Sequence, residues 1–249
     1  MTRPPLEVCV DTLEGAWIAA ENGADRIELC AALSEGGLTP SAGVMVAAAK
    51  LPVPVFAMVR PRRGGFAYSD LEKTAMLRDI EAVERAGLAG IVLGAVNDQR
   101  DLDIDFLSAA LTGTDLPATL HRAIDTVRDY GRAVEDAIEI GFERILTSGQ
   151  ADKAEFGMER LAQAVTIAAG RLSVMAGSGV NASNAKRILK HGGVGELHAS
   201  CSAPRRDHAD PKTAETRLGF VAASGLRDTD ANLVQSLRHV MDLYAEAAA

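Results

Sequence analysis

Three thiols are the residues with the most distinctive chemistry in this sequence: Cys9, Cys30 and Cys201. Each lies at or just after the end of a short apolar run that is typical of a β-strand, namely the first, second and last such runs of the chain. Thiolates are soft ligands that suit Cu(I) or Zn(II), and a histidine such as His198 completes sites of this kind. One interpretation is therefore a metal site formed by these thiols where the strands end; in the other, free cysteine packs as a small hydrophobic residue.

Carboxylates and an arginine alternate with two of these thiols. Glu7 precedes Cys9 by two residues, and Arg26, Glu28 and Cys30 follow one another at the same interval. Residues two apart on a strand share a face, so each set points to one side of its strand. In one interpretation, Arg26 forms a buried ion pair with Glu7 or Glu28. In the other, partial burial tunes Glu28 for acid–base chemistry.

Histidines, arginines and a serine lie at the ends of other candidate strands. His121 and His198 end two of them beside charged residues, where imidazole is suited to act as a general acid or base. Arg60 and Arg122 are placed similarly, and a guanidinium group holds carboxylate or phosphate oxygens bidentately. Ser148 follows a further strand. These residues predict a site for a small anionic ligand.

A glycine-containing turn adds a second element that favours anions. The run Ala176-Gly177-Ser178-Gly179-Val180-Asn181 leaves a candidate strand and opens a helix. Glycine lets the backbone approach a ligand closely, and the amino terminus of a helix attracts negative charge. We expect Gly177 and Gly179 to hold an anion, although a tight turn also needs glycine for its own geometry.

The elements that must position these residues alternate regularly along the chain. Eight strands are predicted, at residues 6–10, 26–29, 53–59, 90–94, 117–121, 144–147, 172–175 and 195–199. Helical stretches separate them, and most end at a glycine that suits a helix carboxyl terminus. This pattern predicts an α/β fold, a (β/α)8 TIM barrel in a single domain spanning residues 1–249, with one long irregular loop at 202–228. An open, doubly wound sheet is the competing architecture. In the barrel, all the candidate residues gather where the strands end.

Composition limits the classes of partner. The formal net charge is -8 and the pI is near 5.2, which disfavours nucleic acid and anionic membranes as partners. The sequence shows no secretory signal and no apolar run long enough to cross a bilayer. Three cysteines make no disulfide framework, so we expect free thiols in a reducing, cytoplasmic location.

Motifs through most of the chain closely resemble the CutC copper homeostasis family. They are Leu6-Glu7-Val8-Cys9-Val10-Asp11, Asp25-Arg26-Ile27-Glu28-Leu29-Cys30, Ser34-Glu35-Gly36-Gly37-Leu38-Thr39-Pro40-Ser41, Arg60-Pro61-Arg62, Tyr68-Ser69-Asp70, His121-Arg122-Ala123 with Asp125, Arg144-Ile145-Leu146-Thr147-Ser148-Gly149-Gln150, Met175-Ala176-Gly177-Ser178-Gly179-Val180 and His198-Ala199-Ser200. The match runs in order up to about Ser200. It departs from the family pattern at Arg63-Gly64-Gly65, at Ile124, and in the stretch after Cys201.

The resemblance implies a barrel fold, a cytoplasmic location and a part in copper handling, with Cys9 and Cys30 as Cu(I) ligands. It also adds Asp125 to the catalytic candidates Glu28, His121 and His198. As partners we expect a copper ion or a small anionic ligand and a homo-oligomeric assembly, with no nucleic acid and no membrane.

These residues are compatible with two functions of different classes. The first is a cytoplasmic copper homeostasis protein that binds copper where the strands end. The second is an enzyme that acts on a small anionic or phosphorylated metabolite, with histidine and glutamate as acid and base. A third, structural role requires Glu7, Arg26 and Glu28 to satisfy one another completely. Whether the chain is an enzyme stays open.

Overall fold

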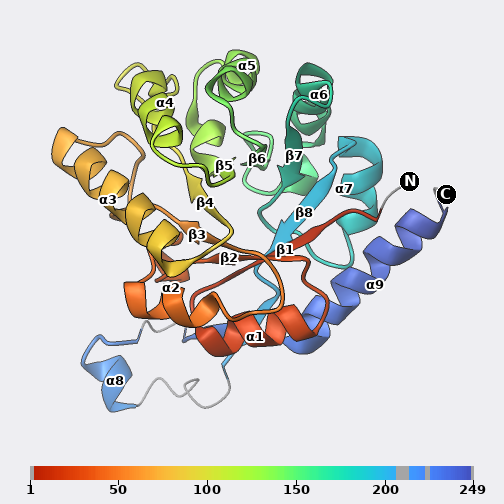
Figure 1. Ribbon diagram of the computed structural model, residues 1–249. Helices are drawn as coiled ribbons and strands as arrows, with labels where there is room; N and C mark the ends of the chain where they lie inside the picture. Colours follow the sequence, from red (N-terminus) through yellow and green to blue (C-terminus); the bar gives the residue numbers. More distant parts are fainter. Residues whose placement is uncertain (1–2, 206–212, 222–224, 248–249) are drawn as a thin grey trace.

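A closed barrel of eight parallel strands forms the centre of the molecule (Figure 1). The structure is a computed structural model and describes residues 3–205, 213–221 and 225–247. The strands of the barrel are β1 (Leu6–Val10), β2 (Arg26–Leu29), β3 (Val55–Met58), β4 (Gly90–Leu93), β5 (Ala118–Leu120), β6 (Arg144–Thr147), β7 (Ser173–Ala176) and β8 (Glu196–Ala199). All eight coincide with predicted strands, so the (β/α)8 barrel is confirmed and the open sheet is excluded.

Helices cover the outside of the barrel. They are α1 (Leu13–Glu21), α2 (Ala42–Ala48), α3 (Asp70–Ala86), α4 (Ile104–Thr112), α5 (Tyr130–Ile140), α6 (Met158–Ala168), α7 (Ala185–Gly192) and α9 (Ala231–Ala247), with short 3-10 turns η1 (Leu33–Glu35), η2 (Arg122–Thr126) and η3 (Ala154–Phe156). The start of α3 shows how local sequence sets a boundary: Ser69 and Glu72 form a reciprocal capping box. Its end lies at Gly87, which adopts a left-handed conformation.

Barrel closure places β1, which carries Cys9, between β2, which carries Glu28, and β8, which carries His198. Between β1 and β2, Cys9 is paired with Glu28, and between β1 and β8, Glu7 is paired with His198. β1 therefore lies between the other two strands, with the polar side chains of all three facing the barrel interior. The main apolar core lies instead between the strands and the surrounding helices.

Ion pairs fill the interior of the barrel below this level. Arg26 is bonded to both Glu7 and Glu196, and Arg144 Nε lies 3.3 Å from Glu196 Oε1. The guanidinium groups of Arg26 and Arg144 each lie 5.3 Å from the centroid of the Phe56 ring. The predicted ion pair thus joins Arg26 to Glu7 rather than to Glu28, which leaves Glu28 for another partner.

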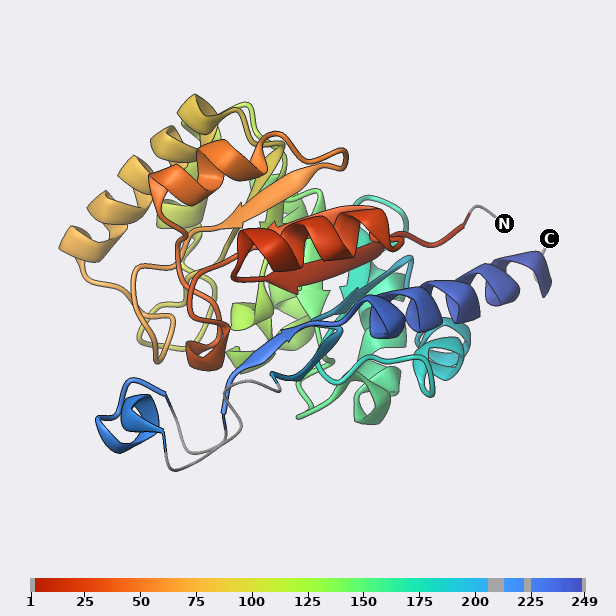
Figure 2. The same ribbon diagram turned by 90° about the horizontal axis from the view of Figure 1, so that it is seen from below.

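The segment predicted as one long irregular loop at 202–228 contains regular structure. β9 (Ser202–Pro204) and β10 (Arg227–Thr229) pair antiparallel, and the short helix α8 (Ala214–Arg217) lies between them along the chain. Both ribbon views show α8 standing away from the barrel (Figures 1 and 2). Residues 206–212 and 222–224 of the predicted loop lie outside the described residues. The strand pair escaped prediction because each strand is only three residues long, too short to show a periodic pattern.

In the part of the chain that the structure describes, no helix is both long and apolar enough to span a bilayer.

Candidate metal centre

Cys9, Glu28 and His198 converge at the carboxyl-terminal end of the barrel. One ligand atom from each, a thiol sulfur, a carboxylate oxygen and an imidazole nitrogen, lies within 4.8 Å of the other two. His198 Nε2 is 3.0 Å from Glu28 Oε2. All three residues are buried or nearly so, with exposed fractions of 8%, 3% and 9%. Among the described residues, this is the one group of at least three such side chains with the spacing of metal ligands.

A glycine makes room for the imidazole of this group. Gly177 on the neighbouring β7–α7 turn faces His198, and a Cβ atom there would lie 3.2 Å from His198 Nδ1 and 2.5 Å from Leu146 Cδ1. Its backbone N–H donates to the carbonyl oxygen of Thr147. Gly177 therefore contributes by close packing against His198.

The charges of the cluster stabilise one another. Burial disfavours the imidazolium form of His198, but its interactions with Cys9 and Glu28 outweigh this effect and raise the pKa of His198 well above its usual value. Burial likewise opposes ionisation of Glu28, yet His198 lowers the pKa of the Glu28 carboxyl below its ordinary value. Without a metal, Glu28 and His198 form an ion pair. A metal ion bound at this position would take the place of the imidazole proton, so its binding would release a proton.

Two carboxylate oxygens beside the cluster have no hydrogen-bond partner. Glu7 Oε1 and Glu28 Oε1 are both buried and without a donor among the residues that the structure describes. Glu7 Oε1 lies 3.8 Å from His198 Nε2. Buried acceptors are almost always satisfied in native proteins, so unpaired oxygens of this kind point to a cation or an ordered water. The donor set of thiol, imidazole and carboxylate fits a metal ion.

The other two cysteines lie outside this group. Cys30 Sγ is 3.8 Å from Glu28 Oε2, and burial, followed by the charge of Glu28, raises the pKa of its thiol. Cys201 is half-buried after β8, and burial, with the charge of Cys9, raises the pKa of its thiol to about 12. The structure thus groups Cys9 with Glu28 and His198, while Cys30 lies beside Glu28 but outside this group.

Arg60 and His121 lie in the sector of the barrel formed by β3 to β5. The Nη atoms of Arg60 donate to the carbonyl oxygens of Glu35, Gly37 and Gly64, at 2.8 to 3.0 Å. Its guanidinium lies 5.1 Å from the centroid of the Phe66 ring. Arg60 thereby fastens the loop after β2 to the end of β3. His121 is 3% exposed, and its Nδ1 accepts the backbone N–H of Ala123.

Arg122, Asp125 and Ser148 bond mainly to one another. Arg122 Nε donates to Asp125 Oδ2 at 2.8 Å, and Arg122 Nη2 donates to Ser148 Oγ at 2.8 Å. Asp125 also accepts the hydroxyl of Thr147 and the backbone N–H groups of Ser148 and Gln150. A carboxylate that accepts so many hydrogen bonds has little capacity left for proton transfer. This network ties η2 to the loop after β6.

The β7–α7 turn is held by polar side chains. The carbonyl oxygen of Gly179 accepts from the side-chain amides of Asn181 and Asn184. Gly179 has a φ of +69°, and a Cβ atom there would lie 3.0 Å from the side chain of Lys153. This position requires glycine for the turn itself, and Lys153 is the nearest cationic side chain.

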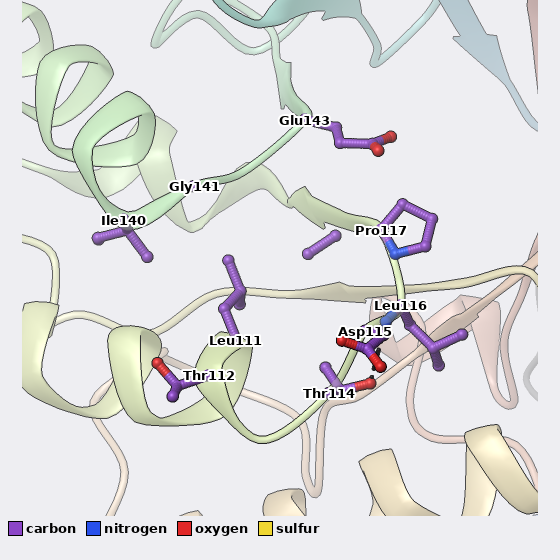
Figure 3. Close-up of a pocket in the computed structure, with 10 residues that line it drawn as sticks. Leu111, Thr112, Thr114, Asp115, Leu116, Pro117, Ile140, Gly141 and Glu143 are labelled. Atoms are coloured by element: carbon purple, nitrogen blue, oxygen red, sulfur yellow. Dashed lines mark hydrogen bonds between the residues drawn. The ribbon is translucent and has the colours of Figure 1, made fainter.

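A cavity elsewhere in the molecule lies far from these residues. It has a volume of about 330 Å³ (Figure 3). Its lining comes from residues in the segments 111–118 and 140–143, which precede or begin β5 and β6. It therefore opens at the amino-terminal ends of the strands, opposite to Cys9, Glu28 and His198. That face of a barrel usually contributes to stability rather than to chemistry.

Some residues of this region were not expected from the sequence. Glu196 and Arg144 complete the ion pairs inside the barrel, and Tyr68 and Phe66 flank Arg60. The period-two pattern of β6 and β8 places Arg144 and Glu196 on the inner face with Leu146 and His198. No periodic pattern predicts the positions of Phe66 and Tyr68, because both residues lie on a loop.

Known proteins share both the sequence and the fold. The model of the CutC family matches residues 5–203. A family protein CutC of Sinorhizobium medicae (strain WSM419) is 45% identical over 249 residues, which covers 100% of both chains. Another, from Aliivibrio fischeri (strain MJ11), is 48% identical over 205 residues, 80% of this chain and 83% of that one.

Solved structures agree with this assignment. The crystal structure of the putative copper homeostasis protein CutC from Streptococcus agalactiae superposes with a TM-score of 0.76 at 30% identity, covering 79% of this chain and 98% of that one. A thiamine phosphate pyrophosphorylase from Pyrococcus furiosus, at 15% identity and a TM-score of 0.58, shares the barrel fold alone. The resemblance carried by the motifs is confirmed: the chain belongs to the CutC family.

Proposed function

We propose that this chain takes part in copper homeostasis and binds a copper ion through Cys9, Glu28 and His198 at the carboxyl-terminal end of the barrel. The observation that carries the proposal is the convergence of these three side chains beside the unpaired oxygens of Glu7 and Glu28. The family supports copper as the ion, because the Streptococcus agalactiae relative is titled a putative copper homeostasis protein.

We take Cu(I) as the bound form. Cys9 and His198 supply a soft thiolate and an imidazole, both of which Cu(I) accepts. Cys30 provides a second thiol close to Glu28, at 3.8 Å from its Oε2. The three cysteines are free, which suits the reducing conditions of a cytoplasmic protein.

Anaerobic titration of Cu(I) against a competing chelator tests this function. Cys9→Ser removes the thiolate ligand, and we expect the affinity for Cu(I) to fall by roughly tenfold or more. Cys201→Ser is the matched control, since it makes the same chemical change outside the cluster and leaves the affinity unchanged. A wild-type affinity no better than that of a Cys9→Ser, Cys30→Ser double variant overturns the proposal.

The second function, catalysis on a phosphorylated metabolite, has weaker support. Arg122, Ser148 and Asp125 are engaged with one another, and two of the three nitrogens of the Arg60 guanidinium are bonded to backbone carbonyls. These groups are therefore better placed to fix loops than to hold a phosphate.

A further inference from the structure

One carboxylate beside the candidate metal centre has an oxygen without a hydrogen-bond donor among the described residues. Glu7 is fully buried, and its Oε2 is bonded to Arg26. Its Oε1 accepts no hydrogen bond and lies 3.8 Å from His198 Nε2. A buried carboxylate oxygen is costly when no group satisfies it, so Oε1 indicates a further partner on its free side.

The strand register and Arg26 together determine where this oxygen lies. Glu7 precedes Cys9 by two residues on β1, so both side chains face the barrel interior. β1 pairs Glu7 with Arg26 on β2 and with His198 on β8. Because Arg26 is bonded to Oε2, Oε1 is the oxygen that remains for contacts near His198.

The distances from His198 Nε2 to two carboxylates suit a shared metal ion. Nε2 lies 3.0 Å from Glu28 Oε2 and 3.8 Å from Glu7 Oε1. Nitrogen and oxygen ligands lie about 2.0–2.2 Å from Zn(II), so two of them in a tetrahedral site are about 3.4 Å apart. The two observed distances lie on either side of this value. Glu7 is outside the group of ligand atoms within 4.8 Å of one another, so its carboxylate must tilt toward Cys9 and Glu28 to join it.

The charges of the side chains at and below the centre favour a divalent ion. A metal binds cysteine as the thiolate and histidine as the neutral imidazole. In that state, four negative groups face two guanidinium groups among the side chains in contact here: Glu7, Glu28, Glu196 and Cys9 against Arg26 and Arg144. Uncompensated charge is costly in a buried position. A divalent ion neutralises both of the negative charges that remain, whereas Cu(I) neutralises one.

We propose that the candidate metal centre also takes a divalent ion such as Zn(II), with Glu7 Oε1 as the fourth ligand beside Cys9, Glu28 and His198. The inference rests on the proposed function, because it concerns the same site, and it adds a residue and a second class of ion. One thiolate, one imidazole and two carboxylates are all donors that Zn(II) accepts in a four-coordinate site.

Cu(I) and the divalent ion differ in the ligands that they use. Soft sulfur ligands select Cu(I), whereas carboxylate oxygens are harder donors. Cys30, whose Sγ lies 3.8 Å from Glu28 Oε2, offers Cu(I) a second sulfur. The two ions therefore share Cys9 and His198, but Glu7 serves the divalent ion and Cys30 serves Cu(I).

Metal titrations of the full-length protein test this assignment. Competition with a chelator measures the affinity for Zn(II), and Co(II) is the spectroscopic probe, because four-coordinate Co(II) absorbs visible light much more strongly than six-coordinate Co(II). We expect the wild type to bind one equivalent of Co(II) with the intense absorption of a four-coordinate ion. Cu(I) is expected to displace it, since both ions need Cys9. This readout requires no variant.

Variants separate the two ions. Glu7→Gln is expected to lower the affinity for Zn(II) by roughly tenfold or more and to weaken the Co(II) absorption, with the affinity for Cu(I) unchanged. Cys30→Ser is expected to do the reverse. Glu196→Gln is the matched control: it alters a buried carboxylate bonded to the same Arg26, but neither oxygen of Glu196 is free, so the affinity for Zn(II) is expected to stay the same. Urea denaturation verifies that each variant is folded.

Three results overturn the proposal. One is a wild type that binds Cu(I) but neither Zn(II) nor Co(II), which leaves the proposed copper function intact. Another is an equal loss of Zn(II) affinity in Glu7→Gln and Glu196→Gln, which reduces Glu7 to a structural partner of Arg26. The third is a Co(II) spectrum that is the same in the wild type and in Glu7→Gln. Conversely, binding of Zn(II) that depends on Glu7, without any binding of Cu(I), supports this inference and overturns the copper function.

Discussion

His198 Nε2 lies 3.0 Å from Glu28 Oε2, although the two residues are 170 positions apart and their strands, β8 and β2, do not pair with each other. Both strands flank β1, and Cys9 on β1 completes the group. The contact exists only because the barrel is closed. As a result, Glu28 pairs with the imidazole of His198 and takes no part in the ion pairs of Arg26 and Arg144 inside the barrel.

Substitution of Glu28 tests the role of this contact. Glu28→Gln removes the negative charge that favours the imidazolium form, so the pKa of His198 is expected to fall. It also removes a charged ligand, so the affinity for Cu(I) is expected to fall by roughly tenfold to a hundredfold. Histidine titration by magnetic resonance and chelator competition measure the two effects. Glu35→Gln, which changes an exposed carboxylate on η1, serves as control; an equal loss in both variants contradicts a specific role for Glu28.

The buried His121 imidazole makes stability depend on pH. Its folded-state pKa is about 4 against an ordinary value of 6.5, so the unfolded chain takes up the proton first as the pH falls. Its contribution to the free energy of unfolding is therefore complete above pH 6.5 and is lost as the pH falls from 6.5 to 4. The loss is at most about 3 kcal/mol.

Urea denaturation across this pH range measures that loss. His121→Gln lacks the titrating group, so its free energy of unfolding is expected to change less than that of the wild type between the same pH values. Identical slopes for the two proteins show that His121 does not contribute.

The ion pairs inside the barrel predict a large loss of stability when Glu196 is substituted. Glu196→Gln leaves Arg144 without its buried carboxylate and Arg26 with Glu7 alone. Removing one partner from a buried ion pair costs about 3–5 kcal/mol. Glu81→Gln is the control, because Glu81 pairs with Arg78 on the surface of α3, where such pairs contribute about 0–1 kcal/mol. Equal denaturation midpoints for the two variants contradict this account.

Gly94 is predicted to be intolerant of a side chain. Gly94→Ala places a Cβ atom 2.5 Å from His121 Nδ1, and the His121 ring is buried and also packs against Phe66. We expect a loss of about 1–3 kcal/mol of stability, the usual cost of overpacking. Thermal and urea denaturation measure it. Gly65→Ala is the matched control, since no atom lies within 4 Å of a Cβ there; a stable Gly94→Ala protein shows that the ring has room to move.

The sequence by itself determines which residues face the inside of the barrel. Alternation along β1 and β2 places Glu7 with Cys9, and Arg26 with Glu28 and Cys30, and the eight regularly spaced strands predict the closed fold. The same alternation places His198 at the end of β8. These features are local, because they depend on residues a few positions apart.

Only the tertiary structure decides which of these inward side chains meet. Closure pairs Glu7 with His198 across β1 and β8 and pairs Cys9 with Glu28 across β1 and β2. In those registers, Arg26 pairs with Glu7 and Glu28 pairs with His198. Cys30 lies outside the group of candidate metal ligands. The register between strands is set by the packing of all eight strands and their helices together. It therefore cannot be predicted from a local sequence pattern.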